Sequence, residues 1–527
     1  MFTHNNSSNN DNKNSANDAH TNTMLGMLVL GILGLAVHQS MPSISAFYIR
    51  NFQTVWMTAW VLVLGLVFLA VRWFVKKNRD LEIEALTHEH VVAPVDPACI
   101  YVGEVGTTNV FLTRKQRLGH VQILGTTGRG KTESLILPWI VRDARNGFSS
   151  LVIDGKGDPE LVQQLKSALR GRANIQVFDL GTPKRSAVMN PLSFGGPQEV
   201  TDRIFASFDF LDPFYKGVQY DTALSLISAI KASGETLTFS RLHACLASDQ
   251  ELARVAKACS NMRQKERLQK MLASPRPTRE ANHMGLSSQL APYAEGELAG
   301  LLNGRRTKDD ELLELEATLI GHRKPGQMPT VLIVLLPTLK YQIMAKQLGR
   351  MLLQELAGCI GSRASRGGAS SSFYPVYLDE FSAFAYQGFE QILNKARSSQ
   401  VALHLSHQSM SDLSMVSPDF ARTVNTNTNV KCLLGLNDPD TADFYARHIG
   451  TKGSERRTER IEDMGFMNRS ARTGQASVRE VEEYKIHPNE LKNFNRGHGV
   501  LHLPTPDGNF TARVQFARLA GKEKHGE

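Results

Sequence analysis

The chain beyond residue 100 alternates between short apolar runs and longer stretches with helical spacing. The apolar runs lie at residues 119–125, 150–154, 329–337, 373–379 and 401–405. Continuous apolar runs of this length are typical of strands that are buried on both faces. Residues 205–325 lack such runs and contain amphipathic segments instead. The pattern predicts an α/β fold, a doubly wound sheet interrupted by an inserted all-alpha domain.

The N-terminal region has a different pattern. Residues 1–23 contain eight Asn and few apolar side chains, so we expect a disordered tail. Residues 24–49 and 51–71 contain no Asp, Glu, Lys or Arg, and each stretch supplies the roughly 20 residues that a membrane-spanning helix needs. A signal peptide at 24–37 is the alternative, although no cationic segment precedes it. The pattern predicts two transmembrane helices.

The charges that flank these stretches predict their orientation. The connection between them holds only Arg50, whereas four basic residues follow the second stretch: Arg72, Lys76, Lys77 and Arg79. The positive-inside rule places residue 72 onward in the cytoplasm, with a short external loop and a cytoplasmic N-terminal tail.

Composition narrows the kinds of partner and of cysteine-based site that we expect. The 60 Lys and Arg exceed the 51 Asp and Glu, and the formal charge of +9 favours an anionic partner, nucleic acid or phospholipid. The five cysteines are scattered and odd in number, so neither a disulfide framework nor a structural zinc site is expected.

Residues 125–132 have the pattern GxxxxGK[ST] between an apolar strand and a helical stretch. Glycines let successive backbone N–H groups point at phosphate oxygens, Lys131 reaches the β- and γ-phosphates, and Thr132 holds Mg²⁺. The sequence therefore predicts binding of ATP and Mg²⁺ by residues Gly125, Thr126, Thr127, Gly128, Arg129, Gly130, Lys131, Thr132 and Glu133.

A second apolar strand ends in two acids, Asp379 and Glu380. Together with the phosphate loop they predict a complete nucleotide site, in which Asp379 orders the Mg²⁺ shell and Glu380 polarises the attacking water. Pro375 is tolerable in this strand only near its start or at an unpaired position. A third strand, 150–154, runs into Gly155-Lys-Gly-Asp158, which suits either a ligand-lined crevice or an ordinary turn in which Asp158 caps the next helix.

Two charged segments lie outside this site. Residues 254–279 hold one acid, Glu266, and eight basic residues: Arg254, Lys257, Arg263, Lys265, Arg267, Lys270, Arg276 and Arg279. Such a face suits contacts with the phosphate backbone of a nucleic acid. A solvated helix face is the alternative interpretation. Residues 452–485 balance acids and bases and predict an exposed, mobile excursion.

These residues resemble the membrane-anchored coupling ATPases of conjugation and type IV secretion, the TraD/TraG-like coupling proteins. The resemblance rests on the two N-terminal spans and on five segments: GTTGRGKTES (125–134), VIDGKGDPEL (152–161), VYLDEFSAF (376–384), LSHQSMSDL (405–413) and GLNDPDTADFYARHIG (435–450). The DGKGD segment is nearer the Dot/Icm and mobilisation-plasmid branch.

The resemblance implies a homohexameric, RecA-like P-loop motor at the cell inner membrane. Such a motor recruits relaxase–DNA complexes or protein substrates to the type IV secretion channel and drives their transfer with ATP. It implies catalytic roles for Lys131 and Glu380, γ-phosphate sensing by Gln408, and a finger role for Arg397 toward the neighbouring subunit's nucleotide. A solvated Arg397 at a helix end is the alternative.

The domains expected are therefore a tail (1–23), a two-helix anchor (24–72), a nucleotide-binding domain in two parts (73–204 and 326–527) and the all-alpha insert (205–325). Two other functions fit the same motifs. An FtsK-type DNA translocase would carry a longer linker and a C-terminal DNA-reading module, and neither is evident. A docking receptor would use nucleotide only to lock a hexamer.

Overall fold

The computed structural model describes residues 60, 62–70, 72, 96–210, 212–304, 312–320, 326–368, 371–464 and 469–519, with the backbone alone between 455 and 480. The chain divides into two units, Met1–Glu82 and Ile83–Glu527.

In the first unit, residues 62–70 are helical. Their apolar side chains are exposed: Leu62, Leu66 and Phe68 are 69%, 66% and 65% exposed. Among the described residues, no helix combines the length and the hydropathy that crossing a bilayer requires. The predicted tail, the predicted first span and most of the predicted second span lie outside the described residues.

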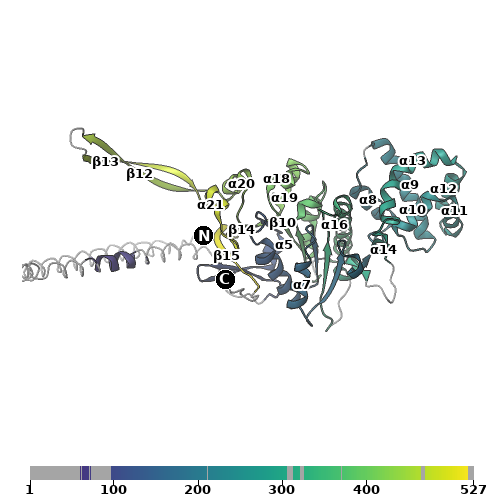
Figure 1. The fold of residues 1–527 in the computed structure, drawn as a ribbon, viewed down its shortest axis with the longest axis horizontal. Coiled ribbons are helices and arrows are strands. Elements are labelled where there is room, and N and C mark those ends of the chain that lie inside the picture. The colour runs from purple at the N-terminus through teal and green to yellow at the C-terminus, as the bar shows by residue number, and fades with distance from the viewer. Residues whose placement is uncertain are drawn as a thin grey trace, which may run out of the picture. The chain divides into compact units, whose positions relative to one another are not determined.

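The second unit is built on one mixed sheet of 11 described strands, in the order β2-β1-β15-β14-β11-β3-β10-β9-β4-β8-β5 (Figure 1). The strands from β11 to β5 are parallel, whereas β14, β15, β1 and β2 pair antiparallel. The strands are β1 (Ile100–Val105), β2 (Thr108–Leu112), β3 (Val121–Leu124), β4 (Ser150–Asp154), β5 (Asn174–Asp179), β8 (Thr330–Leu335), β9 (Tyr374–Asp379), β10 (Val401–His407), β11 (Val430–Leu433), β14 (His498–Thr505) and β15 (Gly508–Phe516).

Helices cover both faces of the parallel strands, which is why the central strands β4 and β8 are apolar along most of their length. Val152 of β4 faces the core that contains Trp139 and Leu165, whereas Leu151 and Ile153 face the core that contains Leu352. The helices that contribute to the first core are η1 (Thr132–Ile136), α6 (Leu137–Arg145) and α7 (Pro159–Ala168), and those of the second include α8 (Pro197–Ser207), α16 (Gln342–Ser365), α17 (Glu390–Ala396) and α19 (Pro418–Asn427). The predicted α/β fold is confirmed, with an antiparallel extension that the sequence did not predict.

Shorter helices and turns complete this unit. They are α5 (Arg114–Leu118), η2 (Pro183–Arg185), α15 (Leu315–Leu319), η4 (Phe381–Ala383), η5 (Arg397–Ser399), α18 (Met410–Ser414), α20 (Pro439–Ile449) and α21 (Pro488–Asn493). Pro375 occupies the second position of β9, where its missing N–H costs least.

A bundle of helices interrupts the sheet between β5 and β8 (Figure 1). Its two ends are joined by a short parallel pair, β6 (Val188–Met189) with β7 (Leu312–Leu313). The helices between them, besides α8, are α9 (Pro213–Ala232), α10 (Phe239–Ala247), α11 (Asp249–Ala258), α12 (Met262–Ala273), α13 (Arg276–Ala294) and α14 (Ala299–Leu302). Leu226, Leu242 and Leu286 are fully buried among them, so the amphipathic segments of the sequence pack on one another.

The charged segment predicted as an excursion forms a two-stranded antiparallel sheet, β12 (Thr451–Met464) with β13 (Arg469–Tyr484). Its strands pair only with each other among the described strands. A strand pair without an apolar face has no hydrophobic signature in the sequence, which explains why the pattern did not predict it.

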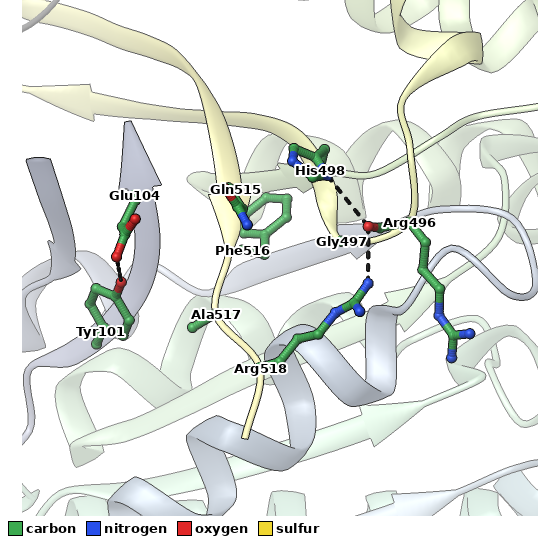
Figure 2. Close-up of a pocket in the computed structure, with 9 residues that line it drawn as sticks. All are labelled: Tyr101, Glu104, Arg496, Gly497, His498, Gln515, Phe516, Ala517 and Arg518. Carbon is green, nitrogen blue, oxygen red and sulfur yellow. Dashed lines mark hydrogen bonds between the residues drawn. The ribbon is translucent and has the colours of Figure 1, made fainter. Parts of the chain in front are cut away.

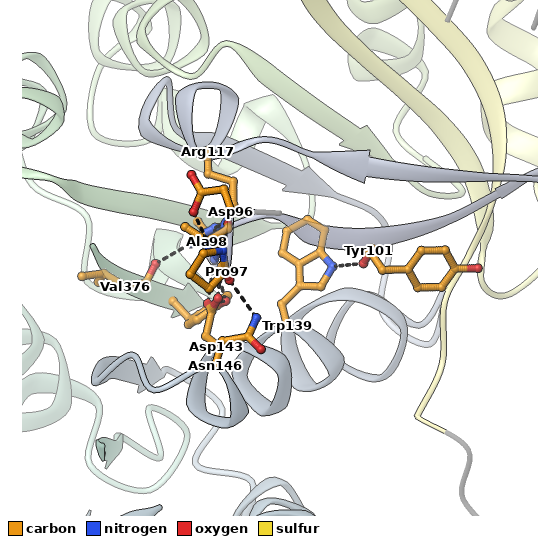
Figure 3. A network of polar contacts seen from close by, with 11 residues as sticks. Asp96, Pro97, Ala98, Tyr101, Arg117, Trp139, Asp143, Asn146 and Val376 are labelled. Carbon is orange, nitrogen blue, oxygen red and sulfur yellow. Dashed lines mark hydrogen bonds and ion pairs between the residues drawn. The ribbon is translucent and has the colours of Figure 1, made fainter. Parts of the chain in front are cut away.

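A buried polar network lies between α5, α6 and the sheet (Figure 3). Arg117 is 0% exposed, and its two Nη atoms donate to the two carboxylate oxygens of Asp143 at 2.8 and 2.6 Å. The guanidinium also donates to the Ala98 carbonyl at 2.8 Å and to the Tyr377 hydroxyl at 3.2 Å. It lies 4.6 Å from the centre of the Phe373 ring. Bidentate pairing and additional acceptors allow this charge to be buried.

Candidate nucleotide-binding site

The phosphate loop predicted at residues 125–132 connects β3 to η1 and α6. Gly128 and Gly130 have φ angles of 82° and 93°, in the left-handed region that favours glycine. The Thr126 N–H donates to the Gly435 carbonyl at 3.0 Å, which ties the loop to the segment after β11. The backbone therefore has the curl that presents N–H groups to an anion.

The structure brings the phosphate loop and the acidic strand together. Thr132 Oγ1 donates to Asp379 Oδ2 at 2.6 Å, although the two residues are 247 positions apart. Ser406 Oγ donates to the other carboxylate oxygen, Asp379 Oδ1, at 2.7 Å. These contacts arise because β10 lies between β3 and β9, so their carboxyl ends meet at one edge of the sheet.

Glu380 follows at the same edge with a φ angle of 49°, a left-handed conformation that turns the chain out of the strand. Its carboxylate accepts a hydrogen bond from Gln408 Nε2 at 3.2 Å and lies 4.0 Å from Lys131 Nζ. Lys131 is 6% exposed and donates to the Gly125 carbonyl at 2.6 Å. Three predicted catalytic residues, Lys131, Glu380 and Gln408, thus form one cluster.

A buried carboxyl lies beside this cluster. Asp154 ends β4 and is aligned with Asp379 of the neighbouring β9. Burial, and then the charge of Asp379, raise the pKa of Asp154 to about 6. Its oxygens accept hydrogen bonds from the backbone N–H groups of Lys156 and Asp158 at 2.9 and 2.6 Å, so it also shapes the turn.

The oxygen donors at this edge suit Mg²⁺. The Thr132 hydroxyl and the Asp379 carboxylate are hard ligands, and Mg²⁺ in nucleotide sites takes one or two protein ligands with phosphate and water as the rest. A cation here would also offset the repulsion between Asp154 and Asp379. Among the described residues, no group of three or more His, Cys, Asp or Glu forms a metal cage.

A cavity of about 270 Å³ opens on these groups. The predicted residues that line it are Thr126, Thr127, Gly128, Gly130, Lys131, Thr132, Glu133, Asp379 and Glu380. It is also lined by Lys156 and Asp158, which favours the ligand-lined crevice for the segment after β4. Asp158 caps α7 as well, because its side chain accepts from the Glu160 N–H.

The sequence did not predict four other lining residues, Glu160, Leu161, Gln164 and Arg496. Glu160 and Gln164 lie one turn apart on α7, facing the loop, and the spacing of a helix that begins at Pro159 was the available signal. Arg496 precedes β14 and forms an ion pair with Glu133 of the phosphate loop. Only the sheet order, with β14 beside β11, brings Arg496 there.

Arg496 also borders a second cavity, of about 420 Å³, between β1, β14 and β15 (Figure 2). Its walls include Tyr101, Glu104, His498 and Arg518. Arg518 donates to the Arg496 carbonyl at 3.0 Å, and the Tyr101 hydroxyl donates to Glu104 at 3.2 Å. The two cavities are therefore neighbours that share one arginine.

Four predicted site residues do not line the cavity: Gly125 and Gln408, which hydrogen-bond to the lining residues Lys131 and Glu380, and Arg129 and Arg397. Arg129 donates to the Phe494 carbonyl at 3.0 Å and to Asn437 Oδ1 at 3.4 Å, so its side chain anchors the loop. Arg397 is exposed in η5, before β10, whereas Gln408 follows the other end of that strand. Arg397 therefore does not reach the cavity of its own chain.

The basic segment 254–279 is less basic than its sequence suggests. Four of its eight basic residues form ion pairs with acids, most of them from other parts of the bundle: Arg254 with Glu235 and Glu251, Arg267 with Asp221, Arg276 with Glu280, and Arg279 with Asp249. Within the described residues the other four have no ion-pair partner: Lys257, Arg263, Lys265 and Lys270.

Comparisons with known proteins agree with this geometry. Residues 375–496 match the family described as the TraM recognition site of TraD and TraG, a span that includes Asp379, Glu380 and Gln408. The chain is 24% identical over 398 residues to the type 4 coupling protein DotL of Legionella pneumophila. That match covers 63% of this chain and 49% of DotL, so the chain spans about half the length of its curated relative.

Solved structures share the fold. The conjugative coupling protein TrwB, without its N-terminal segment, superposes with a TM-score of 0.53 at 15% identity over 80% of this chain and 90% of that one. TrwB with ADP and Mg²⁺ gives 0.52 at 14% identity, over 80% and 90%. VirB4 of Thermoanaerobacter pseudethanolicus gives 0.51 at 14%, over 80% and 96%. The resemblance drawn from the motifs is confirmed, and together these findings support a type IV coupling protein.

Proposed function

We propose that this chain is an ATP-hydrolysing coupling protein, anchored in the inner membrane by its N-terminal spans. It recruits relaxase–DNA complexes or protein substrates and drives their transfer through a type IV secretion channel. The observation that carries the proposal is the 2.6 Å contact between Thr132 and Asp379, with Glu380 beside them, because it joins a phosphate loop to the carboxylates that hydrolysis needs.

Each residue of the cluster has a distinct part. Thr132 and Asp379 would hold Mg²⁺, which neutralises charge on the phosphates when it is bound. Lys131 donates a hydrogen bond to the Gly125 carbonyl, and from this position it can stabilise the negative charge that develops on the phosphoryl oxygens. Glu380 orients and polarises a water, and Gln408 holds the Glu380 carboxylate in position.

The substitution Glu380→Gln tests hydrolysis and its use. Loss of general-base catalysis should lower ATP turnover by about 10²- to 10⁴-fold while ATP binding persists, and substrate transfer should stop. Glu297→Gln, at an exposed glutamate outside the cavity, is the matched control and should leave both rates unchanged. Undiminished transfer by the Glu380→Gln protein would contradict the motor and identify a docking receptor instead.

DNA binding by the insert is the second part of the proposal, and the basic side chains without acidic partners support it. Reversing Arg263, Lys265 and Lys270, three of these side chains, to Glu should weaken DNA binding and reduce the magnitude of the slope of log K against log[salt] by up to about 3, since each phosphate contact contributes about 0.9. The control reverses Lys166, Arg170 and Arg172, which carry the same charge on the α/β part. An equal slope in filter-binding titrations of both triple variants would contradict a role for the insert.

Anchoring and assembly complete the proposal. The exposed apolar side chains of residues 62–70 suit contact with lipid, and carbonate-resistant fractionation of the full chain with membranes tests this. In a homohexamer Arg397 would act on a neighbouring subunit's nucleotide, since it does not reach its own. Full turnover in a purified Arg397→Ala hexamer would exclude that role.

A further inference from the structure

A third cavity, of about 480 Å³, lies at the edge of the sheet opposite the phosphate loop. Ser149 and Phe373, which line it, come directly before β4 and β9, whereas Asp379, at the other end of β9, lines the nucleotide cavity. Asn146, also in its wall, donates to the Pro97 carbonyl at 2.7 Å (Figure 3). The cavity is therefore separate from the proposed nucleotide site.

The wall contains a buried arginine without a counterion. Arg363, in the last turn of α16, is 4% exposed. Its Nη2 donates to the Ser372 carbonyl, whereas its Nη1 is buried with no hydrogen-bond partner in the part of the chain that the structure describes. No aspartate or glutamate is among the described residues that line the cavity, and a second arginine, Arg366, lies exposed on its rim.

Arg117 shows what a buried arginine ordinarily requires. It has both oxygens of Asp143 and a carbonyl, and these contacts offset the cost of removing its charge from water. Arg363 has one carbonyl. The carboxyl end of α16 supplies about half of one negative charge, which leaves the rest uncompensated. Burial accordingly lowers the pKa of Arg363 to about 10.

We propose that this cavity binds a small-molecule oxyanion, a phosphate or carboxylate group that pairs with Arg363 and Arg366. Hydroxyl and amide groups of Asn146, Ser149 and Thr318 line the same space and can bind further oxygens. The rings of Phe148 and Phe373, which meet edge to face with their centroids 5.3 Å apart, offer an apolar wall to the body of the ligand. The volume is within the range of small-molecule sites.

Inorganic phosphate is the probe, and thermal unfolding of the full chain is the measurement. The phosphate loop also binds phosphate, so the background is Lys131→Ala. At ten times its dissociation constant, phosphate should raise the Tm of this variant by about 1–2 °C over chloride at equal ionic strength. Adding Arg363→Gln should abolish the rise. Acetate in place of phosphate distinguishes the two oxyanions: a rise with acetate as well extends the site to carboxylates.

Two outcomes would overturn the proposal. One is the absence of any rise in the Lys131→Ala protein with either anion. The other is an equal rise after Arg363→Gln is added. Arg366→Gln is the second variant, because substitutions of exposed side chains change stability little. It should weaken phosphate binding at least threefold by equilibrium dialysis, and unchanged binding would also contradict the proposal. Neither result depends on ATP hydrolysis.

Discussion

Two buried cations of the second unit, Arg117 and Lys131, have opposite surroundings. Arg117 is enclosed by Asp143, Ala98 and Tyr377, and each nearby acceptor is used. Lys131 has one short hydrogen bond to its own loop and a carboxylate 4.0 Å away. A network in which the donors have their acceptors stabilises the fold. A buried amine that lines a cavity and can still donate hydrogen bonds is able to bind a ligand.

The largest effect should follow from breaking the saturated network. Asp143→Ala leaves the Arg117 guanidinium buried and unpaired, which should lower the free energy of unfolding by about 3–5 kcal/mol. Urea denaturation measures it. The double variant Arg117→Met/Asp143→Leu removes both charges and is the control. If the single and double variants lose the same stability, charge pairing is not what this network contributes.

A somewhat smaller effect, of a different kind, is expected at the other cation. Lys131→Ala should reduce ATP turnover by about 10²- to 10³-fold, or about 2.7–4 kcal/mol of transition-state stabilisation. Its free energy of unfolding without nucleotide should fall by less than half the loss from Asp143→Ala. A larger loss of stability would show that Lys131, like Arg117, mainly stabilises the fold, and it would contradict the difference drawn between the two residues.

The pH dependence of stability tests another buried charged group, Asp154, which lies beside the cluster of Lys131, Glu380 and Gln408. Asp154 has a pKa of about 6 in the folded chain, above the value of about 4 in an unfolded one. A raised acid pKa means that its stabilising contribution is present below about pH 4 and is lost as the pH rises through about 6. The loss should be about 2–3 kcal/mol.

Urea denaturation at pH 4 and pH 7 measures this loss as the difference between the wild type and Asp154→Asn. The wild type should lose stability relative to the variant as the pH rises. A difference that does not change with pH would mean that burial and the charge of Asp379 do not raise the pKa of Asp154 in the folded chain.

Local patterns in the sequence predicted much of the fold. The run 150–154 coincides with β4, and 373–379 contains β9, because strands buried on both faces are apolar without interruption. The antiparallel extension was harder to predict. Strands β1 and β2, and likewise β14 and β15, follow one another directly, without the intervening helix that marks each parallel strand in the sequence.

The residues of the candidate site also differ in whether the sequence alone predicts them. The residues of the phosphate loop and Asp379 have local motifs, whereas Arg496 has none and reaches the loop only through the order of the sheet. The basic segment shows the converse: Arg279 reads as an exposed charge, yet it is 8% exposed and pairs with Asp249 of another helix. Tertiary partners cannot be inferred from one segment's charge pattern.

The place where the helical bundle enters the sheet has an evolutionary consequence. The chain leaves after β5 and returns at β8, and these strands are hydrogen-bonded neighbours, with the β6–β7 pair joining the bundle's two ends. Exchange of the whole bundle for another would therefore disturb no strand register and move no residue of the phosphate loop. A lineage can therefore replace the helical bundle while it inherits the same arrangement of Thr132, Asp379 and Glu380.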